Sequence, residues 1–164
     1  MEGPRFLPQL RRKKLSLFYE DFTVGQSFSG GRRTIPEAEI IQFAQIYDPQ
    51  NMHLDRLYAD EGPFHGLIAS GFHTLCLAWW LFLQLGLVQE SMWVGIGIDA
   101  LRWQRPVRPG DTVSLKVEIV DKSPTSAPDR GRIVFSHTLT NQHGETVMTY
   151  QSINLISCKV DHPS

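Results

Sequence analysis

The amino-acid sequence predicts an α+β fold in which a curved antiparallel sheet wraps around one long apolar helix. Fourteen of the 21 residues in 66–86 are Ala, Leu, Ile, Phe, Trp or Cys, a composition typical of a helix enclosed by its own protein. After residue 91, apolar and polar residues alternate with the period of a β-strand. Because these strands follow one another without an intervening helix, we expect them to pair as an antiparallel sheet.

The segment before the apolar stretch is predicted to contain one strand and one amphipathic helix. Residues 27–34, SFSGGRRT, are expected to form the strand. In the following segment, PEAEIIQFAQIYD, apolar residues recur at the helical spacing i, i+3, i+4 and i+7. These residues are Ile40, Phe43, Ala44 and Tyr47. Pro49 disfavours helix at Asp48, so we expect a loop to follow, with a further short helix in DRLYADEG.

Four strands are predicted after residue 91. Their sequences are MWVGIGIDALRWQRPV, TVSLKVEIV, RIVFSHTLT and ETVMTYQSINLI. Between the last two, NQHG predicts a four-residue hairpin turn that ends in glycine. Between the second and third, KSPTSAPDRG is expected to be a loop. A flat sheet would not cover the long apolar helix, and the sheet should therefore curl around it.

Chain length and charge predict a single domain with two tails. The 164 residues suit one domain, which we expect at 15–158 between tails at 1–14 and 159–164. The net charge of -1 gives no overall attraction to nucleic acid or to anionic lipid, and neither is expected as a partner. The tail MEGPRFLPQLRRKK carries five basic residues and one acid. We interpret it as a solvated, flexible segment, with contact to nucleic acid or membrane as the alternative.

The cysteines and the apolar stretch favour a cytoplasmic protein without a membrane span. Cys76 and Cys158 have no neighbours at metal-ligand spacing, and Cys76 is expected to be a buried thiol. A reduced, cytoplasmic protein is the simplest interpretation. Residues 66–86 are long enough to span a bilayer. His73 and Gln84 within them, and the absence of a flanking basic cluster, favour a helix buried in the protein instead.

The stretch YDPQNMHLD places an acid and an imidazole, Asp48 and His53, five residues apart after the predicted helix end. This is a pairing that general acid–base catalysis uses, since a positioned acid or base contributes about 10²–10⁴-fold. Structural roles remain open at this point. Asp48 could merely close the helix end, because Asp-Pro is a common turn former. His53 could be a buried histidine with a purely structural hydrogen bond.

Four pieces of the sequence together resemble the MaoC-type dehydratases, the family that includes the (R)-specific enoyl-CoA hydratases. The pieces are the helix leading into DPQNMHLD, then FHGLIASGFHT, then LRWQRPVRPGDTVSLKVEIVD, and the closing pair of strands. The resemblance covers residues 16–157 and implies the hot-dog fold. This sequence departs from the family phrase at Tyr47, where the family has Gly, and at Gln50-Asn51, where it has Asn-Pro. The spacing from Asp48 to His53 is retained.

The resemblance implies a hydro-lyase. Such an enzyme adds water to the double bond of a 2-enoyl thioester, an acyl-CoA in the first instance, or dehydrates a 3-hydroxyacyl thioester. Asp48 and His53 would share the water, with either one as the base, and the backbone N–H of Gly66 at the helix start would stabilise the thioester oxyanion. Gly66 could instead serve only close packing. No metal or redox cofactor is implied, since coenzyme A is part of the substrate. The expected assembly is a homodimer or a dimer of dimers.

Further substrate contacts are assigned on the same resemblance. They are Asn51, His65, Thr74 and Arg105. Thr74 would line the acyl pocket, and Arg105 with its neighbours Arg102 and Arg108 would meet the phosphates of coenzyme A. A solvated strand edge is the alternative for the arginines. A structural role is the alternative for His65, and a core hydroxyl bonded to the backbone is the alternative for Thr74.

Two other functions remain open. A hot-dog thioesterase usually carries its carboxylate on the central helix, but residues 66–86 contain no Asp or Glu. A non-catalytic subunit that binds acyl thioesters would have no need for both Asp48 and His53.

Overall fold

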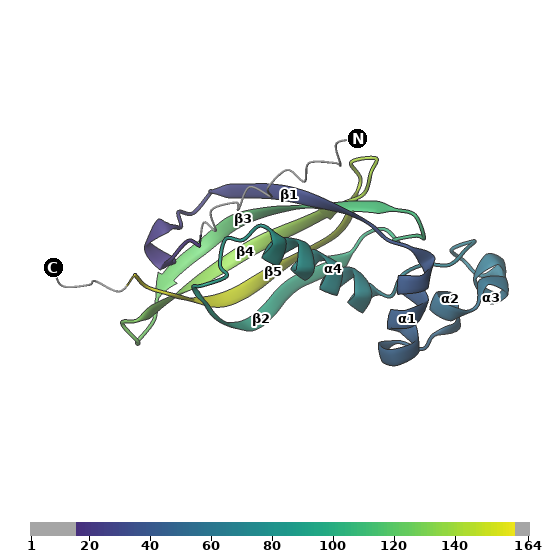
Figure 1. The fold of residues 1–164 in the computed structure, drawn as a ribbon, viewed down its shortest axis with the longest axis horizontal. Helices are drawn as coiled ribbons and strands as arrows, with labels where there is room; N and C mark the ends of the chain where they lie inside the picture. Colours follow the sequence, from purple (N-terminus) through teal and green to yellow (C-terminus); the bar gives the residue numbers. More distant parts are fainter. Residues whose placement is uncertain (1–15, 160–164) are drawn as a thin grey trace, which may run out of the picture.

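The computed structural model describes residues 16–159, and these form one antiparallel sheet with its helices on the concave side and at one end (Figure 1). The tail 1–14 predicted above lies outside the described residues. A 3-10 turn at Tyr19–Asp21 precedes the first strand. The strands are β1 Ser27–Thr34, β2 Met92–Trp103, β3 Thr112–Pro124, β4 Arg130–Thr140 and β5 Thr146–Ser157. The helices are α1 Glu37–Tyr47, α2 Asn51–Leu54, α3 Arg56–Glu61 and α4 Gly71–Gln84.

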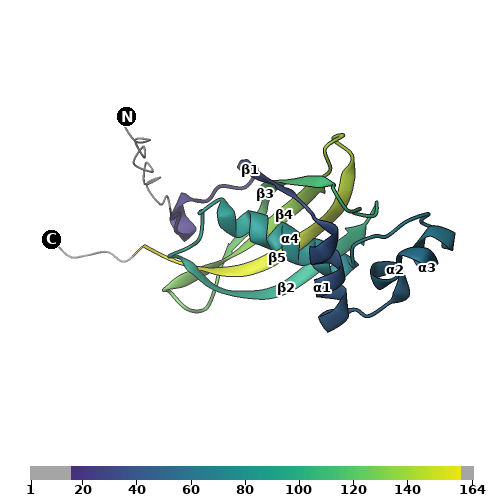
Figure 2. The same ribbon diagram turned by 45° about the vertical axis from the view of Figure 1, so that its right-hand side comes forward.

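The sheet curves around α4, as Figures 1 and 2 show from two directions. Its strand order is β1-β3-β4-β5-β2, with every neighbouring pair antiparallel. This confirms the predicted α+β class and the hot-dog architecture. The three short helices α1, α2 and α3 lie together beyond one end of the sheet, next to the beginning of α4. Because β1 and β2 are the outer strands, β2 leaves one edge without a partner within residues 16–159.

The core lies between α4 and the concave face of the sheet. Leu77, Ala78, Leu81 and Phe82 are the buried apolar residues of the helix. Phe82 contacts Phe135 of β4, with ring centroids 5.2 Å apart. Burying one large apolar side chain contributes about 1.5–3 kcal/mol. Because several such side chains lie on this face of α4, the face supplies much of the energy that holds the helix against the sheet.

The central helix is shorter than predicted, and its start lies five residues later. Residues 67–70 are not helical, and two of their backbone N–H groups bond to other segments of the chain. Ile68 N–H donates to Met52 O, and Ala69 N–H donates to Val107 O at 2.8 Å. Ser70 is the N-cap of α4, and its Oγ accepts from Phe72 N–H at 3.1 Å. Tertiary hydrogen bonds therefore override the helical preference of this apolar stretch.

Two further expectations from the sequence are wrong. Cys76 is exposed, because only one face of α4 packs on the sheet, and Phe72 and Trp80 are exposed on the same side of the helix. The segment after Pro49 is not entirely a loop, because Asn51–Leu54 form the short helix α2. Within residues 16–159, none of the helices reaches both the length and the apolar character that a membrane span requires.

The buried imidazole of His137 predicts a loss of stability in acid. It stacks on the Tyr150 ring at 4.2 Å, and burial lowers the pKa of His137 to about 3. An unfolded histidine has a pKa of about 6.5, so the unfolded chain binds more protons between these values. The free energy of unfolding should therefore fall as pH drops through this window, by about 1.4 kcal/mol per pH unit. Urea unfolding at several pH values measures how the free energy of unfolding changes with pH. This change per pH unit should be smaller for His137→Gln than for the wild type, and an equal change would contradict the lowered pKa of His137.

Candidate active site

Asp48 and His53 meet where the chain turns between α1 and α2. Asp48 is the C-cap of α1, and its N–H donates to Ala44 O at 3.0 Å. Pro49 cannot continue the helix, and His53 N–H then donates to Gln50 O at 2.9 Å as α2 forms. This turn places Asp48 Oδ2 at 3.5 Å from His53 Nε2. The two side chains therefore lie side by side.

The hydrogen bond at the far side of the imidazole fixes its tautomer in the neutral state. His53 is buried, with 4% of its surface exposed, and its Nδ1 lies 2.8 Å from Ile68 O. A carbonyl oxygen only accepts, so Nδ1 carries the hydrogen and donates. In the neutral ring, Nε2 is then unprotonated and faces Asp48. His53 is thus prepared to accept a proton at Nε2.

Two donors keep Asp48 ionised. Ser70 Oγ donates to Oδ2 at 2.6 Å, and Gln50 Nε2 donates to Oδ1 at 2.8 Å. These bonds, with that of Ser70 the larger, hold the pKa of Asp48 below its ordinary value, and the neighbouring His53 adds to the shift. The side chain is therefore a carboxylate at neutral pH.

Sequence reasoning missed both Ser70 and Gln50. Serine immediately before a helix is an ordinary N-cap signal. It would have identified Ser70 if the start of the helix had been predicted at residue 71. Ser70 Oγ caps α4 and bonds Asp48 at the same time. No comparable local pattern points to Gln50.

Asp48 and His53 border a cavity of about 380 Å³, which we call the dyad cavity. One wall is the first turn of α4, with Gly71, Phe72 and Thr74. The other is formed by Trp103, the last residue of β2, and by the four residues that follow it, 104–107. The dyad therefore lies at the N-terminal end of α4, inside a space large enough for the reacting part of a small substrate.

Two of the predicted contact residues line the dyad cavity and two do not. Thr74 and Arg105 do, with Thr74 Oγ1 donating to Ser70 O. Asn51 lies in α2 and lines a separate neighbouring cavity. His65 is exposed and has a left-handed backbone with φ 50°. The substrate roles of all four residues remain predictions.

The expected position of Gly66 at the start of the central helix is wrong. Gly66 precedes α4, and its N–H donates to Ala59 O at 2.9 Å. That donor is therefore occupied, because the φ of 139° at Gly66 folds this segment back onto α3. The first residue of α4 is Gly71, which borders the dyad cavity.

The backbone of Gly71 offers an unused donor at the dyad. The next amide, Phe72 N–H, is taken by Ser70 Oγ. Within residues 16–159, Gly71 N–H has no hydrogen-bond partner. Trp103 Nε1 donates to Gly71 O at 2.9 Å and holds this residue against the cavity wall. The amide at a helix start combines a free donor with the positive end of the helix dipole.

Comparison with known proteins agrees with this fold. The chain is 34% identical over 105 residues to the uncharacterized protein YdeM of Bacillus subtilis, covering 64% of this chain and 74% of that protein. It is 31% identical over 119 residues to a 3-hydroxybutyryl-CoA dehydratase of Methylorubrum extorquens, covering 72% of this chain and 71% of that protein. A crystal structure of a MaoC-like dehydratase from Rhodospirillum rubrum matches with a TM-score of 0.78 and 31% identity, covering 88% of this chain and 99% of that chain. The family model described as a MaoC like domain matches residues 21–140, so the chain belongs to the MaoC-like dehydratase family.

Proposed function

We propose that this protein adds water to the double bond of a 2-enoyl thioester carried by coenzyme A, or catalyses the reverse dehydration of a 3-hydroxyacyl thioester. One observation carries the proposal. The carboxylate Oδ2 of Asp48 and Nε2 of His53, the acceptor nitrogen of the neutral ring, lie 3.5 Å apart at the same cavity. The dehydratase relatives support this class of reaction.

The geometry of the dyad suits the activation of one water molecule. A separation of 3.5 Å is too long for a good direct hydrogen bond, but both atoms can accept from a shared water. With its two hydrogens held, the water directs a lone pair at the β-carbon. As the C–O bond forms, one water proton passes to His53 Nε2, and the π electrons move to the thioester as an enolate. His53 then gives that proton to the α-carbon, while Asp48 stabilises the transient imidazolium.

Gly71 is the proposed oxyanion donor in place of Gly66. Negative charge develops on the thioester oxygen in the enolate, and a preorganised backbone donor stabilises it. Losing one such donor typically costs about 10²–10³-fold in rate. Gly71 N–H stands at the start of α4 and on the wall of the dyad cavity, which fits this role.

Gly71→Ala is expected to lower kcat/KM for enoyl-CoA hydration by about 10²-fold. A Cβ at this position would lie 2.7 Å from Trp103 Cε2, so the start of α4 or the indole ring must shift. Displacement of the oxyanion donor by a fraction of an ångström is enough for such a loss. Steady-state kinetics on this variant and on the wild type would check the prediction. A Gly71→Ala enzyme with wild-type kinetics would contradict it.

The proposed reaction uses no metal or redox cofactor, and coenzyme A enters only as part of the substrate. Arg105 lines the dyad cavity, and 53% of its side chain is exposed. It is suited to meet a phosphate of coenzyme A at the cavity mouth, because its guanidinium binds phosphate in a two-pronged geometry. Its present partner, Glu145 at 3.4 Å, is also exposed and would be exchanged at little cost.

A homodimer joined through β2 is proposed as the assembly. This outer strand exposes several large apolar side chains. They are Trp93, Val94, Ile96, Ile98 and Trp103. An unpaired edge with exposed apolar residues is a template for pairing with a second chain.

Ile96→Lys should shift this dimer toward monomer. Ile96 is 53% exposed on β2, and a charge there would be buried without a partner if the strands of two chains meet. Light scattering coupled to size exclusion measures the change in mass. Val120→Lys is the matched control, since Val120 is an exposed apolar residue on β3 and away from that edge. Equal dissociation in both variants would contradict the proposed interface.

One assay separates the proposed function from its alternatives. Purified protein is incubated with crotonyl-CoA while the absorbance of the conjugated double bond is followed. Hydration predicts loss of that absorbance with a 3-hydroxyacyl product, hydrolysis predicts free thiol, and a non-catalytic binder predicts neither. Hydrolysis is disfavoured because α4, Gly71–Gln84, contains no carboxylate. A panel of thioesters assayed in both directions would then define the preferred acyl group.

A further inference from the structure

The beginning of α4 contacts α1 at two polar points, of which only one belongs to the dyad. Ser70 Oγ bonds Asp48 at the end of α1 at 2.6 Å. His73, three residues after Ser70 and therefore on the same face of α4, has its Nε2 3.2 Å from Oε1 of Glu39, near the start of α1. Between these points Phe43 stacks on the imidazole of His73, with ring centroids 4.7 Å apart. The three contacts together set how α1 lies on α4.

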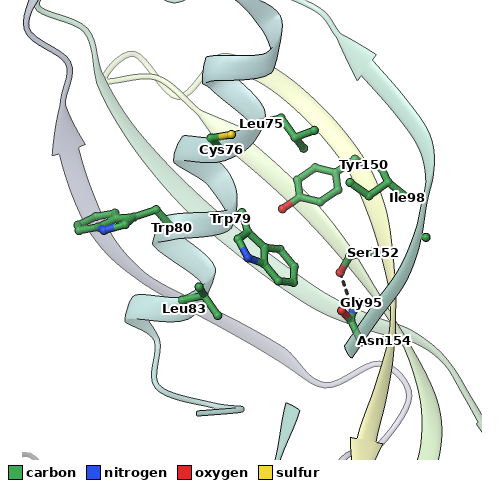
Figure 3. Close-up of a pocket in the computed structure, with 11 residues that line it drawn as sticks. Leu75, Cys76, Trp79, Trp80, Leu83, Gly95, Ile98, Tyr150, Ser152 and Asn154 are labelled. Atoms are coloured by element: carbon green, nitrogen blue, oxygen red, sulfur yellow. Dashed lines mark hydrogen bonds between the residues drawn. The ribbon is translucent and has the colours of Figure 1, made fainter. Parts of the chain in front are cut away.

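Glu39 also connects the two helices to the sheet. Arg33 of β1 donates from Nη2 to both carboxylate oxygens of Glu39, each at 2.9 Å. The same guanidinium lies over the ring of Trp80, 4.5 Å from its centroid. Trp80 extends from α4 on the side of β1, whereas Trp79 points into a cavity of about 660 Å³ between the helix and the sheet (Figure 3). One carboxylate thus joins α1, α4 and β1.

His73 is a neutral hydrogen-bond donor to Glu39. It is buried, with 3% of its surface exposed, and burial lowers the pKa of His73 below its ordinary value, although Glu39 acts in the opposite direction. The ring is therefore uncharged at neutral pH. A carboxylate oxygen only accepts, so the ring hydrogen lies on Nε2 and is donated to Glu39. Because a hydrogen bond is directional, it fixes the angle between the helices more narrowly than apolar packing alone.

The position of Asp48 depends on this angle. Asp48 is the C-cap of α1, and the bond that contributes most to keeping it ionised comes from Ser70 of the other helix. A rotation of α1 on α4 would lengthen and bend that bond. His53 would not follow the rotation, because its ring is held by Ile68 O. A displacement of about 1 Å in a catalytic site can cost about 10²-fold in rate.

We propose that His73 is a positioning residue for Asp48. Through Glu39 it fixes α1 against the first turn of α4, and the fixed helix presents the carboxylate of Asp48 to Ser70 and to the shared water. His73 does not line the dyad cavity. This inference rests on the proposed function and adds a residue that acts on the dyad from outside its cavity.

Two substitutions at position 73 separate the hydrogen bond from the packing. Phenylalanine keeps a ring that can stack on Phe43 but has no donor for Glu39, whereas glutamine retains an N–H. His73→Phe should lower kcat for hydration of crotonyl-CoA by about tenfold or more at nearly unchanged KM, because the walls of the dyad cavity are not altered. His73→Gln should retain most of the wild-type kcat. Steady-state kinetics of both variants and the wild type measure these effects.

The pKa of Asp48 gives a second readout that does not need turnover. NMR of the full-length protein follows the carboxyl carbon signal of Asp48 from neutral pH down to the onset of acid unfolding. Ser70→Ala should raise the pKa of Asp48 by about one pH unit, because a hydrogen bond to the charged form is lost. His73→Phe should shift it in the same direction. Adding His73→Phe to Ser70→Ala should raise it little further, since both changes act through the same bond.

His137→Phe is the matched control. His137 is also a buried histidine that stacks on an aromatic ring, but it lies in β4 and does not contact α1. It should leave the pKa of Asp48 and the kcat of the folded protein unchanged. If His73→Phe does not fold, Glu39→Leu removes the same hydrogen bond from α1 and is judged by the same measurements.

The outcomes separate this inference from the proposed function. An unchanged pKa of Asp48 in His73→Phe overturns the inference, and so does an equal loss of kcat in His73→Gln or an equal pKa shift in His137→Phe. Turnover by the wild type with an unchanged pKa in His73→Phe leaves the proposed function standing. Absence of turnover in the wild type rejects that function, while the NMR titration still decides whether His73 positions Asp48.

Discussion

Asp48→Asn is expected to lower kcat/KM for hydration of a trans-2-enoyl-CoA by about 10²–10⁴-fold. Asparagine has the shape of aspartate but no charge, so it would hold the water weakly and would not stabilise the imidazolium of His53. Only one of its two terminal atoms is an acceptor, so it cannot accept from Ser70 at one atom and from Gln50 at the other as the carboxylate does. Initial rates followed by loss of enoyl absorbance measure the effect.

Asp55→Asn is the matched control for this change. Asp55 caps α3, where its Oδ1 accepts from Tyr58 N–H at 3.1 Å, and it does not line the dyad cavity. An asparagine caps a helix nearly as well, so activity should be retained. Near-full turnover by Asp48→Asn, or an equal loss in the control, would reject the dyad. Thermal unfolding of both variants separates a catalytic loss from a folding defect.

His53→Gln should cause a loss of similar size, and the double variant with Asp48→Asn should lose little more. Glutamine retains an N–H that can donate to Ile68 O, but it has no basic nitrogen at the position of Nε2. Because both side chains act on the same water, removing either one disables the same step. kcat/KM for the two single variants and the double variant measures this coupling. His53→Ala should be equally inactive and less stable, because it leaves the buried Ile68 carbonyl unpaired.

His143→Gln serves as the histidine control, since His143 is exposed and outside the dyad cavity. It should keep wild-type rates. A double variant of Asp48 and His53 whose loss equals the product of the single losses would show that the two side chains act independently. That result would contradict a shared water.

The sequence predicted the fold because its strongest signals are local. The alternation in TVSLKVEIV and the helical spacing in α1 depend only on neighbouring residues, and both elements form where they were expected. The approach of Asp48 to His53 also follows from a local signal, since Pro49 forces the turn between them. These features could be inferred without knowledge of the packing.

The parts that could not be predicted depend on contacts between distant segments. The start of α4 is displaced because Ile68 and Ala69 bond to Met52 and Val107, and no pattern within 66–86 records those partners. This displacement transfers the proposed oxyanion donor from Gly66 to Gly71. Likewise, alternation identifies Tyr150 and Asn154 as strand positions but does not reveal that Tyr150 OH and Asn154 Oδ1 lack partners within residues 16–159.

The Ser70 hydroxyl closes the first turn of α4 and holds Asp48 through a single oxygen atom. Fraying of that turn would release the carboxylate and allow its pKa to rise, while the rest of the sheet stays folded. Loss of activity on warming should therefore precede global melting. Hydrogen exchange at the Phe72 amide would report this local opening.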